Sequence, residues 1–384
     1  MQKKNKKIVS IFVPYIQIGG GPMGYVYNML QGLKKIGDSE KLKINFIGID
    51  CSRYKKATYP KEFLQKGFRF LYRNRIAVRR YFALLKSDIC VFQGYQNPKY
   101  ENIAKKRGKI CIYMPHSPSI MADEQKMMWM LENKTFDDRK YKENYDNEKL
   151  LFESADYIVF PSKNSADSYF SEWKEIITTK KVIYLKSGVI KRDSKNSNDL
   201  RSKFKDKKIV AFCGRYVTHK GFDLFCDVAD TFKNDARVVF VCFGTGALGK
   251  NNFKHNVIDM GFTSDIGTVF NNVDLILIPN RIAYYDLLPI ECASYGKPMV
   301  LSAVGGNIDQ AEDFPDTLTF SSCNINDFHN QIQNALSRLS EDSSWGVSNK
   351  VAYEKEFTEI KFIQRWLDFF ESISIGKTER TLPL

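Results

Sequence analysis

The sequence has few of the residues that hold metals and no segment that is long and apolar enough to cross a membrane. Only four histidines occur, far apart, and none of the eight cysteines belongs to a C-x-x-C pair. Because zinc ligands recur at short, fixed spacings, no structural zinc site is expected. No apolar run approaches the roughly 20 residues that span a bilayer, and no internal repeat or low-complexity segment is visible.

The amino-terminal segment lacks the features of a secretory leader. MQKKNKKIVSIFVPY is basic and then apolar, but its apolar part is short and has no small-residue cleavage site. It runs directly into a glycine-rich stretch, so we interpret it as a first strand. Without a leader, the expected location is the cytoplasm.

Positive charge is in excess, with 58 Lys and Arg residues against 44 Asp and Glu and a formal net charge of +14. This excess predicts anionic partners, among which are nucleotide phosphates, acidic glycans, anionic membranes and nucleic acid. Nucleic acid is disfavoured because no recognised nucleic-acid-binding module accompanies the charge. The length of 384 residues fits two domains of roughly 150–200 residues each.

Short apolar runs alternate with segments of helical spacing along almost the whole chain. Most of the runs are continuously apolar, as in a parallel sheet that is covered on both faces. The expected strands are 8–13, 44–49, 88–93, 109–114, 156–161 and 181–185, followed by 209–214, 238–244, 256–261, 274–279, 298–303 and 317–320. The expected helices lie near 23–36, 66–86, 98–107, 123–154 and 163–175, followed by 221–233, 264–271, 287–296 and 325–340.

A polar, charged stretch at 191–208 divides the strand and helix alternation into two arrays. We interpret this stretch as a linker. The predicted fold class is therefore α/β, with two doubly wound Rossmann-like domains at 1–190 and 191–355 that face each other across a cleft. No motif indicates which domain the last helical pattern, within 356–384, packs against. Packing back on the first domain is one option. Ligands are expected beyond the carboxyl ends of the strands.

A glycine-rich stretch, IGGGPMG at 18–24, follows the first expected strand. It fits the dinucleotide fingerprint G-x-G-x-x-G, but five residues separate the strand from the first glycine, whereas the dinucleotide turn is tight. NAD(P) binding and a plain turn therefore stay as alternatives. Gly20 and Gly21 would let the backbone approach a ligand where a Cβ would obstruct it.

Two cations follow the first strand of the second array. In GRYVTHKGFDLF (214–225) the strand ends at Gly214 and a helix begins near Gly221. Arg215 and Lys220 therefore lie at the carboxyl edge of the sheet, near a helix start, where fixed cations can bind a diphosphate. Two solvated surface charges are the alternative.

A second candidate site is the segment PNRIAYYDLLPIECASYGKPMVL at 279–301, which carries signals for a helix start and a helix end. Asp286 is a candidate N-cap, and the free N–H groups around Leu287 and Leu288 can hold a phosphate. Glu291 lies about one turn into the helix and can accept both hydroxyls of a ribose. The alternative for Glu291 is a carboxylate that only favours the helix dipole.

Together these two segments resemble the donor half of the family 4 glycosyltransferases, whose GT-B fold has two facing Rossmann-like domains. GRYVTHKG is similar to the family's G-R-x-x-x-x-K-G, and residues 283–300 are similar to its E-G-F-G-L-x-x-x-E-A-x-A-x-G-x-P-V-V. The resemblance implies retaining transfer of a sugar from a UDP- or GDP-sugar to a glycan, lipid-linked or protein acceptor, without a metal or another cofactor. The resemblance further implies a hexosyltransferase of polysaccharide biosynthesis.

The resemblance also implies roles for residues of both domains. Arg215 and Lys220 would neutralise the diphosphate, and Glu291 would hold the ribose. The amides near Leu287 and Leu288 would meet phosphate or sugar. The loop that contains Gly20 and Gly21 would lie under the donor. His116, in YMPHSPS after the expected strand 109–114, matches a histidine that commonly contacts the transferred sugar, whereas an exposed loop histidine is the alternative.

The sequence departs from the family pattern at the sugar-contacting part of the second motif. The first glutamate of that motif falls at Ala283, two of its glycines fall at Tyr284 and Asp286, and a later glutamate falls at Asp309. We expect Asp286 to supply the carboxylate from a neighbouring place, or the donor to differ. The alternative is a catalytically inactive binding or scaffold subunit of a glycosylation complex.

The segment KGFRFLYRNRIAVRRYFALLK (66–86) has seven basic residues and no acidic one. On a helical wheel, apolar residues that include Val78, Tyr81 and Phe82 share one face, with Arg80 opposite. Such a helix can lie on an anionic membrane. We favour a helix whose apolar face covers the first sheet while its arginines stay outside, where they can touch lipid headgroups.

Overall fold

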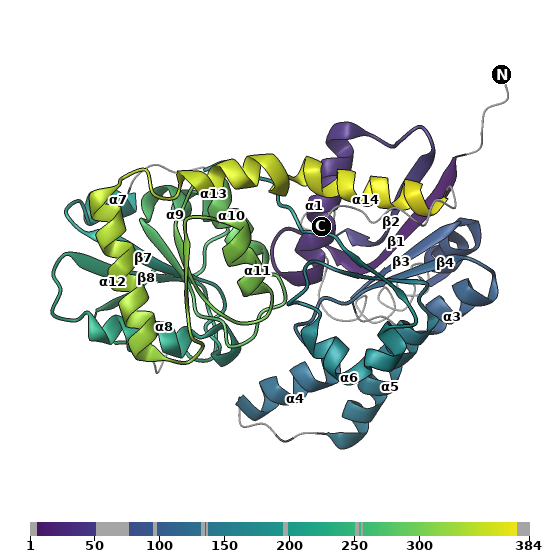
Figure 1. The fold of residues 1–384 in the computed structure, drawn as a ribbon, viewed down its shortest axis with the longest axis horizontal. Coiled ribbons are helices and arrows are strands. Elements are labelled where there is room, and N and C mark those ends of the chain that lie inside the picture. The colour runs from purple at the N-terminus through teal and green to yellow at the C-terminus, as the bar shows by residue number, and fades with distance from the viewer. Residues whose placement is uncertain are drawn as a thin grey trace, which may run out of the picture.

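The computed structural model describes residues 6–50, 77–94, 98–131, 135, 137–194, 199–249, 253–254 and 256–374, without the side chains at positions 49, 50, 131 and 199. It contains two parallel sheets of six strands each, which form two lobes (Figure 1). We call the sheet β1–β6 with its helices the first domain and the sheet β7–β12 with its helices the second domain.

The strand orders show that both sheets are doubly wound. The first sheet has the order β2-β1-β3-β4-β5-β6 and the second has the order β12-β11-β10-β7-β8-β9. The strands are β1 (Lys7–Ile16), β2 (Leu42–Asp50), β3 (Ile89–Gln93), β4 (Ile110–Met114), β5 (Tyr157–Phe160), β6 (Lys181–Tyr184), β7 (Lys208–Cys213), β8 (Val238–Phe243), β9 (Val257–Asp259), β10 (Leu275–Ile278), β11 (Met299–Ser302) and β12 (Thr317–Phe320). Each expected strand occurs, and the predicted α/β fold class is confirmed.

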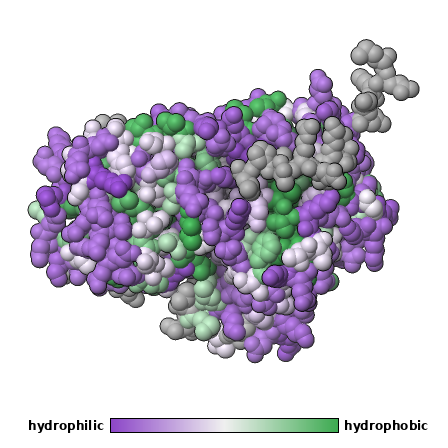
Figure 2. All heavy atoms as spheres, in the orientation of Figure 1, coloured by the Kyte–Doolittle hydropathy of each residue, from purple (hydrophilic) through white to green (hydrophobic). Residues whose placement is uncertain are grey.

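Helices cover both faces of each sheet, so the inner strands are buried as continuous apolar runs. The strands β3, β10 and β11 are buried at every position. The helices are α1 (Gly21–Ile36), α3 (Pro98–Lys106), α4 (Met121–Leu131), α5 (Asp138–Ser154), α6 (Asp167–Ile177), α7 (Asp199–Lys203), α8 (Phe222–Thr231), α9 (Ile266–Asn272), α10 (Leu287–Ser294), α11 (Gly306–Asp313), α12 (Ile325–Glu341), α13 (Val347–Ala352) and α14 (Glu359–Ser374). Polar residues dominate the visible surface (Figure 2). Within the described residues, no helix combines the length and the apolar character needed to span a membrane.

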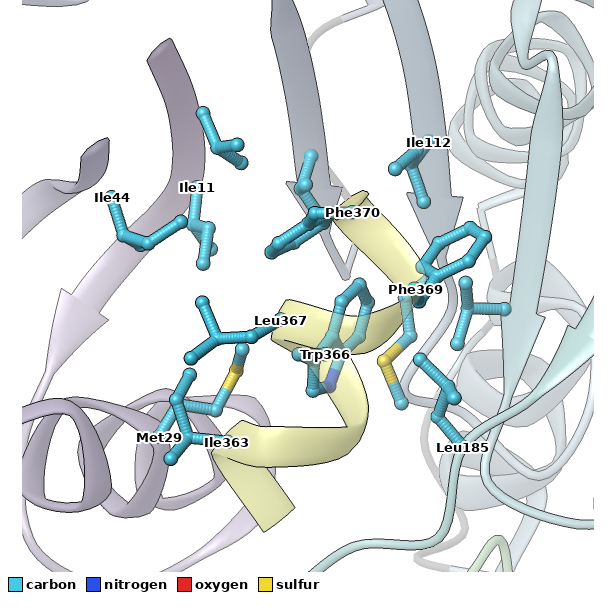
Figure 3. Close-up of a cluster of buried hydrophobic side chains, with 14 of the residues drawn as sticks. Ile11, Met29, Ile44, Ile112, Leu185, Ile363, Trp366, Leu367, Phe369 and Phe370 are labelled. Carbon is cyan, nitrogen blue, oxygen red and sulfur yellow. The ribbon is translucent and has the colours of Figure 1, made fainter. Parts of the chain in front are cut away.

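The carboxyl-terminal helix α14 returns to the first domain, where it lies beside α1 (Figure 1). Its residues Ile363, Trp366 and Phe370 enter the apolar cluster over the first sheet, together with Met29 of α1 (Figure 3). Gly32 allows the close approach of the two helices, because a Cβ there would lie 2.2 Å from the carbonyl oxygen of Glu359.

One helix prediction is wrong, and two short helices were not predicted. The pattern at 123–154 forms two helices, α4 and α5, and Asp137 begins the second by accepting hydrogen bonds from the N–H groups of Arg139 and Lys140. The capping bond satisfies amide groups that have no partner inside the new helix. The short helices α11 and α13 were not predicted, because neither has a long apolar period.

The helix in the described part of the segment 66–86 packs against the first domain as predicted, but with a different face. Residues 66–76 lie outside the described residues, and 77–86 form a helix. Val78, Tyr81 and Phe82 are exposed, whereas the Arg80 guanidinium turns inward and donates to the Val13 carbonyl oxygen at 2.9 Å. This hydrogen bond holds Arg80 against the first sheet. Val78, Tyr81 and Phe82 face outward, whereas Leu84 of the same helix is buried in the core.

Candidate active site

One cavity of about 1140 Å³ is lined by residues of both domains. Strand order reverses between β1 and β3 in the first sheet and between β7 and β10 in the second, and the loops after these four strands line the cavity. Such reversals are where open α/β sheets bind ligands. The lining includes each residue singled out from the sequence: Gly20, Gly21, His116, Arg215, Lys220, Asp286, Leu287, Leu288 and Glu291.

The glycine-rich loop after β1 leads into α1 and faces the cavity. Gly19, Gly20 and Gly21 all have positive φ angles, of 86°, 44° and 56°, a region that other residues occupy only at a cost. A Cβ at any of these positions would meet no atom within 4 Å. Within the chain, backbone conformation therefore explains the glycines, and steric obstruction by a Cβ does not. Approach to a bound ligand stays a prediction.

His116 is held in place at the cavity wall and is not an exposed loop residue. Its Nε2 lies 2.5 Å from Gln93 Oε1, which can only accept, so Nε2 carries the proton. Its ring packs edge-on against Tyr25 and Tyr284, with centroids 4.8 and 6.2 Å away. Burial lowers the pKa of His116 to about 3. The imidazole is thus neutral at physiological pH and suits hydrogen bonding to a ligand better than proton transfer.

The loop after β7 presents its two cations to the cavity. Arg215 Nη2 lies 3.1 Å from His219 Nε2, and Lys220 Nζ forms an ion pair with Asp286. Gly221 makes this loop possible, because its φ is +70° and a Cβ there would lie 1.8 Å from the Pro279 carbonyl oxygen. The alternative of two solvated surface charges does not hold for Lys220, whose side chain is only 26% exposed.

Asp286 stands at the N-cap position of α10, but its side chain makes no capping hydrogen bond. The predicted capping role is wrong, because the carboxylate accepts hydrogen bonds from Lys220 Nζ and from Asn280 Nδ2 instead. Burial raises the pKa of Asp286, but Lys220 and Asn280 outweigh it, and the pKa lies below its usual value. The first turn of α10, with Leu287 and Leu288, therefore faces the cavity without a side-chain cap, an arrangement that suits an anion.

Glu291 lines the cavity and is paired with a residue that the sequence motifs did not indicate. Arg192 Nη2 donates to Glu291 Oε1 at 3.0 Å, and both side chains are mostly buried. Burial raises the pKa of Glu291, and Arg192 opposes the rise. Arg192 lies in the expected linker 191–208, where only the general excess of positive charge could have drawn attention to it.

The position of the missing motif glutamate does not itself line the cavity, although its neighbours Ile282 and Tyr284 do. Ala283 is buried and absent from the cavity lining, and its carbonyl oxygen accepts a hydrogen bond from the N–H of Gly306 at 3.2 Å. Tyr284 lines the cavity instead, and its buried hydroxyl has no hydrogen-bond partner. Asp309 lies outside the cavity lining and bonds the N–H and the side chain of Asn164 in the first domain.

Sequence reasoning missed two carboxylates on the first-domain wall. Glu124 of α4 accepts a hydrogen bond from Ser117 Oγ at 2.5 Å. Glu148 of α5 is buried and accepts from the N–H of Met121 at 2.7 Å. Burial raises the pKa of Glu148 to about 7. Both residues fell inside the expected single helix 123–154, which carries no site signal.

The two doubly wound sheets and the shared cavity between them define the GT-B fold. The sequence model of the family described as "Glycosyl transferases group 1" matches residues 207–338. A glycogen synthase of Elusimicrobium minutum (strain Pei191) is 26% identical over 186 residues, which cover 44% of this chain and 38% of the synthase.

Solved structures are similar over nearly the whole chain, and two of them serve as examples. Sucrose-phosphate synthase of Thermosynechococcus elongatus has a TM-score of 0.67 at 14% identity, with 97% of this chain and 100% of that chain covered. HepE of Anabaena, in complex with UDP and glucose, has a TM-score of 0.67 at 14% identity, with 95% and 100% covered. The resemblance to GT-B glycosyltransferases of the group 1 type is confirmed, while family 4 and the altered motif stay predictions. This chain spans only 38% of the length of the synthase. The activity and the substrates of this chain are therefore given as proposals.

Proposed function

We propose that the protein is a retaining hexosyltransferase that moves a sugar from a UDP- or GDP-sugar to a glycan, lipid-linked or protein acceptor. One observation carries the proposal: Arg215, Lys220 and the uncapped start of α10 face the same cavity. Two cations and free helix N–H groups together suit a diphosphate. The group 1 family match covers these residues and supports the proposal.

In the proposed reaction, the bond between C1 of the sugar and the diphosphate oxygen breaks, and a bond between C1 and the acceptor oxygen forms. The proton of the acceptor hydroxyl passes to the leaving diphosphate, so no protein base is needed. Arg215, Lys220 and the amides of Leu287 and Leu288 would stabilise the negative charge that develops on the leaving oxygen. We propose that these groups replace a metal, so that turnover persists in EDTA.

The other lining residues would hold the donor. Glu291, kept in place by Arg192, would accept the ribose hydroxyls. The loop with Gly20 and Gly21 would lie under the sugar and the phosphates, and the neutral His116 would hydrogen-bond the transferred sugar. Asp286 would supply the carboxylate that Ala283 does not.

A thermal-shift screen of nucleoside diphosphates and their sugars tests the donor site, because a ligand that binds only the native state raises its apparent stability. UDP or GDP should stabilise the protein, whereas stabilisation by NAD(H) or NADP(H) would favour the dinucleotide alternative. The double variant Arg215→Ala/Lys220→Ala should lose the shift and the turnover. The matched control Lys233→Ala/Arg237→Ala removes the same charge outside the cavity and should keep both, and unchanged turnover in the first variant would refute the diphosphate site.

A second function is favoured by the burial of Ala283 away from the cavity. Without a carboxylate at that place, the protein would be an inactive binding or scaffold subunit of a glycosylation complex. Donor hydrolysis or sugar transfer by the purified chain alone supports the enzyme. Nucleotide binding without either reaction, over a panel of UDP- and GDP-sugars, supports the scaffold.

We also propose a cytoplasmic protein that touches an anionic membrane through the segment 66–86. The exposure of Val78, Tyr81 and Phe82 on the helix 77–86 supports such a contact, because exposed aromatic and aliphatic side chains insert at a membrane interface. Sedimentation with vesicles that contain anionic lipid, compared with neutral vesicles, tests it.

A further inference from the structure

The two walls of the cavity differ in their charged residues. The second-domain wall carries cations together with Asp286 and Glu291, whereas the described charged residues of the first-domain wall are carboxylates. Among the described residues that line it, the positive side chains are Arg192, Arg215 and Lys220, all of which follow the first domain in sequence. From the first domain, the described lining contains Glu124 and Glu148 and no lysine or arginine. A diphosphate is therefore attracted to the second-domain wall, and the acidic first-domain wall is left for the acceptor.

Glu124 is the carboxylate that faces the cations across this space. Its helix α4 packs next to the 3-10 helix Thr218–Lys220 of the second domain. Burial raises the pKa of Glu124, while the hydrogen bond from Ser117 and the positive charges of Lys220 and Arg215 lower it. Only its Oε2 receives a hydrogen bond from a described residue, so Oε1 is available to a ligand.

A second, independent observation comes from Tyr284, which precedes α10 of the second domain but packs against the core of the first domain. Tyr284 lines the cavity, its side chain is more than nine-tenths buried, and its hydroxyl has no partner. A buried hydroxyl without a partner is unfavourable. The two other buried tyrosine hydroxyls near Glu148, those of Tyr113 and Tyr169, both donate to its Oε1, at 3.4 and 3.3 Å. The Tyr284 hydroxyl is the one left for a ligand among these three.

We propose that the acceptor binds the first-domain wall without bringing negative charge into the cavity, and that Glu124 orients its attacking hydroxyl. The inference rests on the proposed transfer from a nucleoside-diphosphate sugar. Glu124 Oε1 accepts a hydrogen bond from the attacking hydroxyl, whose proton passes to the leaving diphosphate as the new glycosidic bond forms. Tyr284 donates to a neighbouring oxygen of the acceptor.

An acceptor group that carries a phosphate or a carboxylate is disfavoured by the same wall. It would face the charge of Glu124 with no described positive side chain of the first domain in the cavity to compensate it, and unpaired like charges across an interface oppose binding. A neutral sugar or an amino sugar meets no such repulsion. The structure thus assigns the acceptor end to the uncharged or cationic glycosides.

The test compares three acceptors that differ in charge. The purified full chain receives the UDP- or GDP-sugar that gives the largest thermal shift, with octyl glucoside, octyl glucosaminide or octyl glucuronide. We expect kcat/KM for the anionic glucuronide to be at least roughly tenfold below that for the other two. Glu124→Gln should lower kcat for octyl glucoside roughly 100-fold through loss of orientation. Glu124→Lys should raise kcat/KM for octyl glucuronide, relative to kcat/KM for octyl glucoside, roughly tenfold.

The controls separate this inference from the proposed function. Glu143→Gln removes the same charge from an exposed position of α5 outside the cavity and should change neither rates nor acceptor order. The nucleotide shift of Glu124→Gln should be at least that of the unchanged chain, because a negative charge near Arg215 and Lys220 is lost. No nucleotide shift and no donor turnover in the unchanged chain would sink the proposed function. Three outcomes would overturn only the acceptor assignment, provided that nucleotide still raises the thermal stability. They are a higher kcat/KM for the glucuronide than for the other two glycosides, an equal kcat/KM for all three, and an unchanged order of acceptors in Glu124→Lys.

Discussion

Lys220 and Asp286 form an ion pair on the second-domain wall of the cavity, although they lie 66 positions apart in the chain. Lys220 ends the 3-10 helix after β7, and Asp286 directly precedes α10. Asn280, which follows β10, donates to the same carboxylate oxygen at 2.8 Å. A diphosphate that binds Lys220 must therefore share this cation with Asp286.

The first prediction concerns this shared cation. Asp286→Asn keeps the shape of the side chain but removes its charge, so the pull on Lys220 weakens and the wall becomes more positive. We expect UDP to bind roughly threefold to tenfold more tightly, as measured by titration calorimetry. Turnover of the donor sugar should fall at least roughly tenfold, because Asp286 is proposed to contact that sugar.

A matched control for this change is Asp235→Asn, which removes a carboxylate paired with the exposed Arg237 outside the cavity. It should leave UDP affinity and turnover unchanged. Weaker UDP binding by Asp286→Asn would contradict the prediction, since it would show that Lys220 needs the carboxylate to hold its position.

The second prediction compares two glycines with positive φ. At Gly20 an added Cβ meets no atom within 4 Å, whereas at Gly221 it would lie 1.8 Å from the Pro279 carbonyl oxygen. Gly20→Ala should therefore lower the free energy of unfolding by only about 1–2 kcal/mol, the cost of the left-handed backbone. Gly221→Ala must also move backbone and should cost roughly 3 kcal/mol or more. Urea unfolding of both variants measures the difference, and equal losses would contradict it.

The strands and the motif residues could be predicted because their signals are local. Continuous apolar runs indicated each strand of both sheets, and a parallel sheet then placed the residues that follow β1, β4 and β7 at one edge. The glycine loop, His116, Arg215 and Lys220 all follow strands in this way. Once the sheets face each other, these side chains reach the same cavity.

The missed residues are those whose role depends on contacts between distant segments. Arg192 meets Glu291 across 99 positions, and Glu124 faces the second domain from a helix with no motif. The inward turn of Arg80 depends on a carbonyl group of β1, 67 positions away. A helical wheel cannot show such a partner, so it placed Arg80 on the outer face and Val78, Tyr81 and Phe82 on the inner face, contrary to the structure.

The third prediction is a pH dependence from Glu148, whose side chain is 1% exposed. Burial raises its pKa from 4.5 to about 7 in the folded chain. Between these pH values the folded state binds more protons than the unfolded state, so stability falls as pH rises and levels off above pH 7. Relative to the Glu148→Gln variant, the unchanged chain should lose roughly 3 kcal/mol of its free energy of unfolding between pH 4.5 and pH 7. Urea unfolding of both proteins over pH 4–8 measures the loss, and a difference that does not vary with pH would contradict it.

The last prediction concerns the hold of α14 on the first domain. Trp366 is fully buried, and its Nε1 donates to Tyr25 Oη at 2.9 Å. Tyr25 in turn packs against the His116 ring, so α14 supports the wall of the cavity as well as the core. Trp366→Ala should lower the free energy of unfolding by about 3–5 kcal/mol, because it leaves a large space in a packed cluster.

Trp366→Phe separates the packing from the hydrogen bond, since it keeps a ring but leaves the Tyr25 hydroxyl without its donor. The expected loss is about 1–3 kcal/mol, with weaker donor turnover if Tyr25 shifts against His116. Ile360→Ala, at a partly exposed position of the same helix, should cost less than about 1 kcal/mol. If Trp366→Ala lowered the free energy of unfolding no more than this control, α14 would not stabilise the first domain. The contact from α14 through Tyr25 to the cavity wall would then contribute nothing to stability.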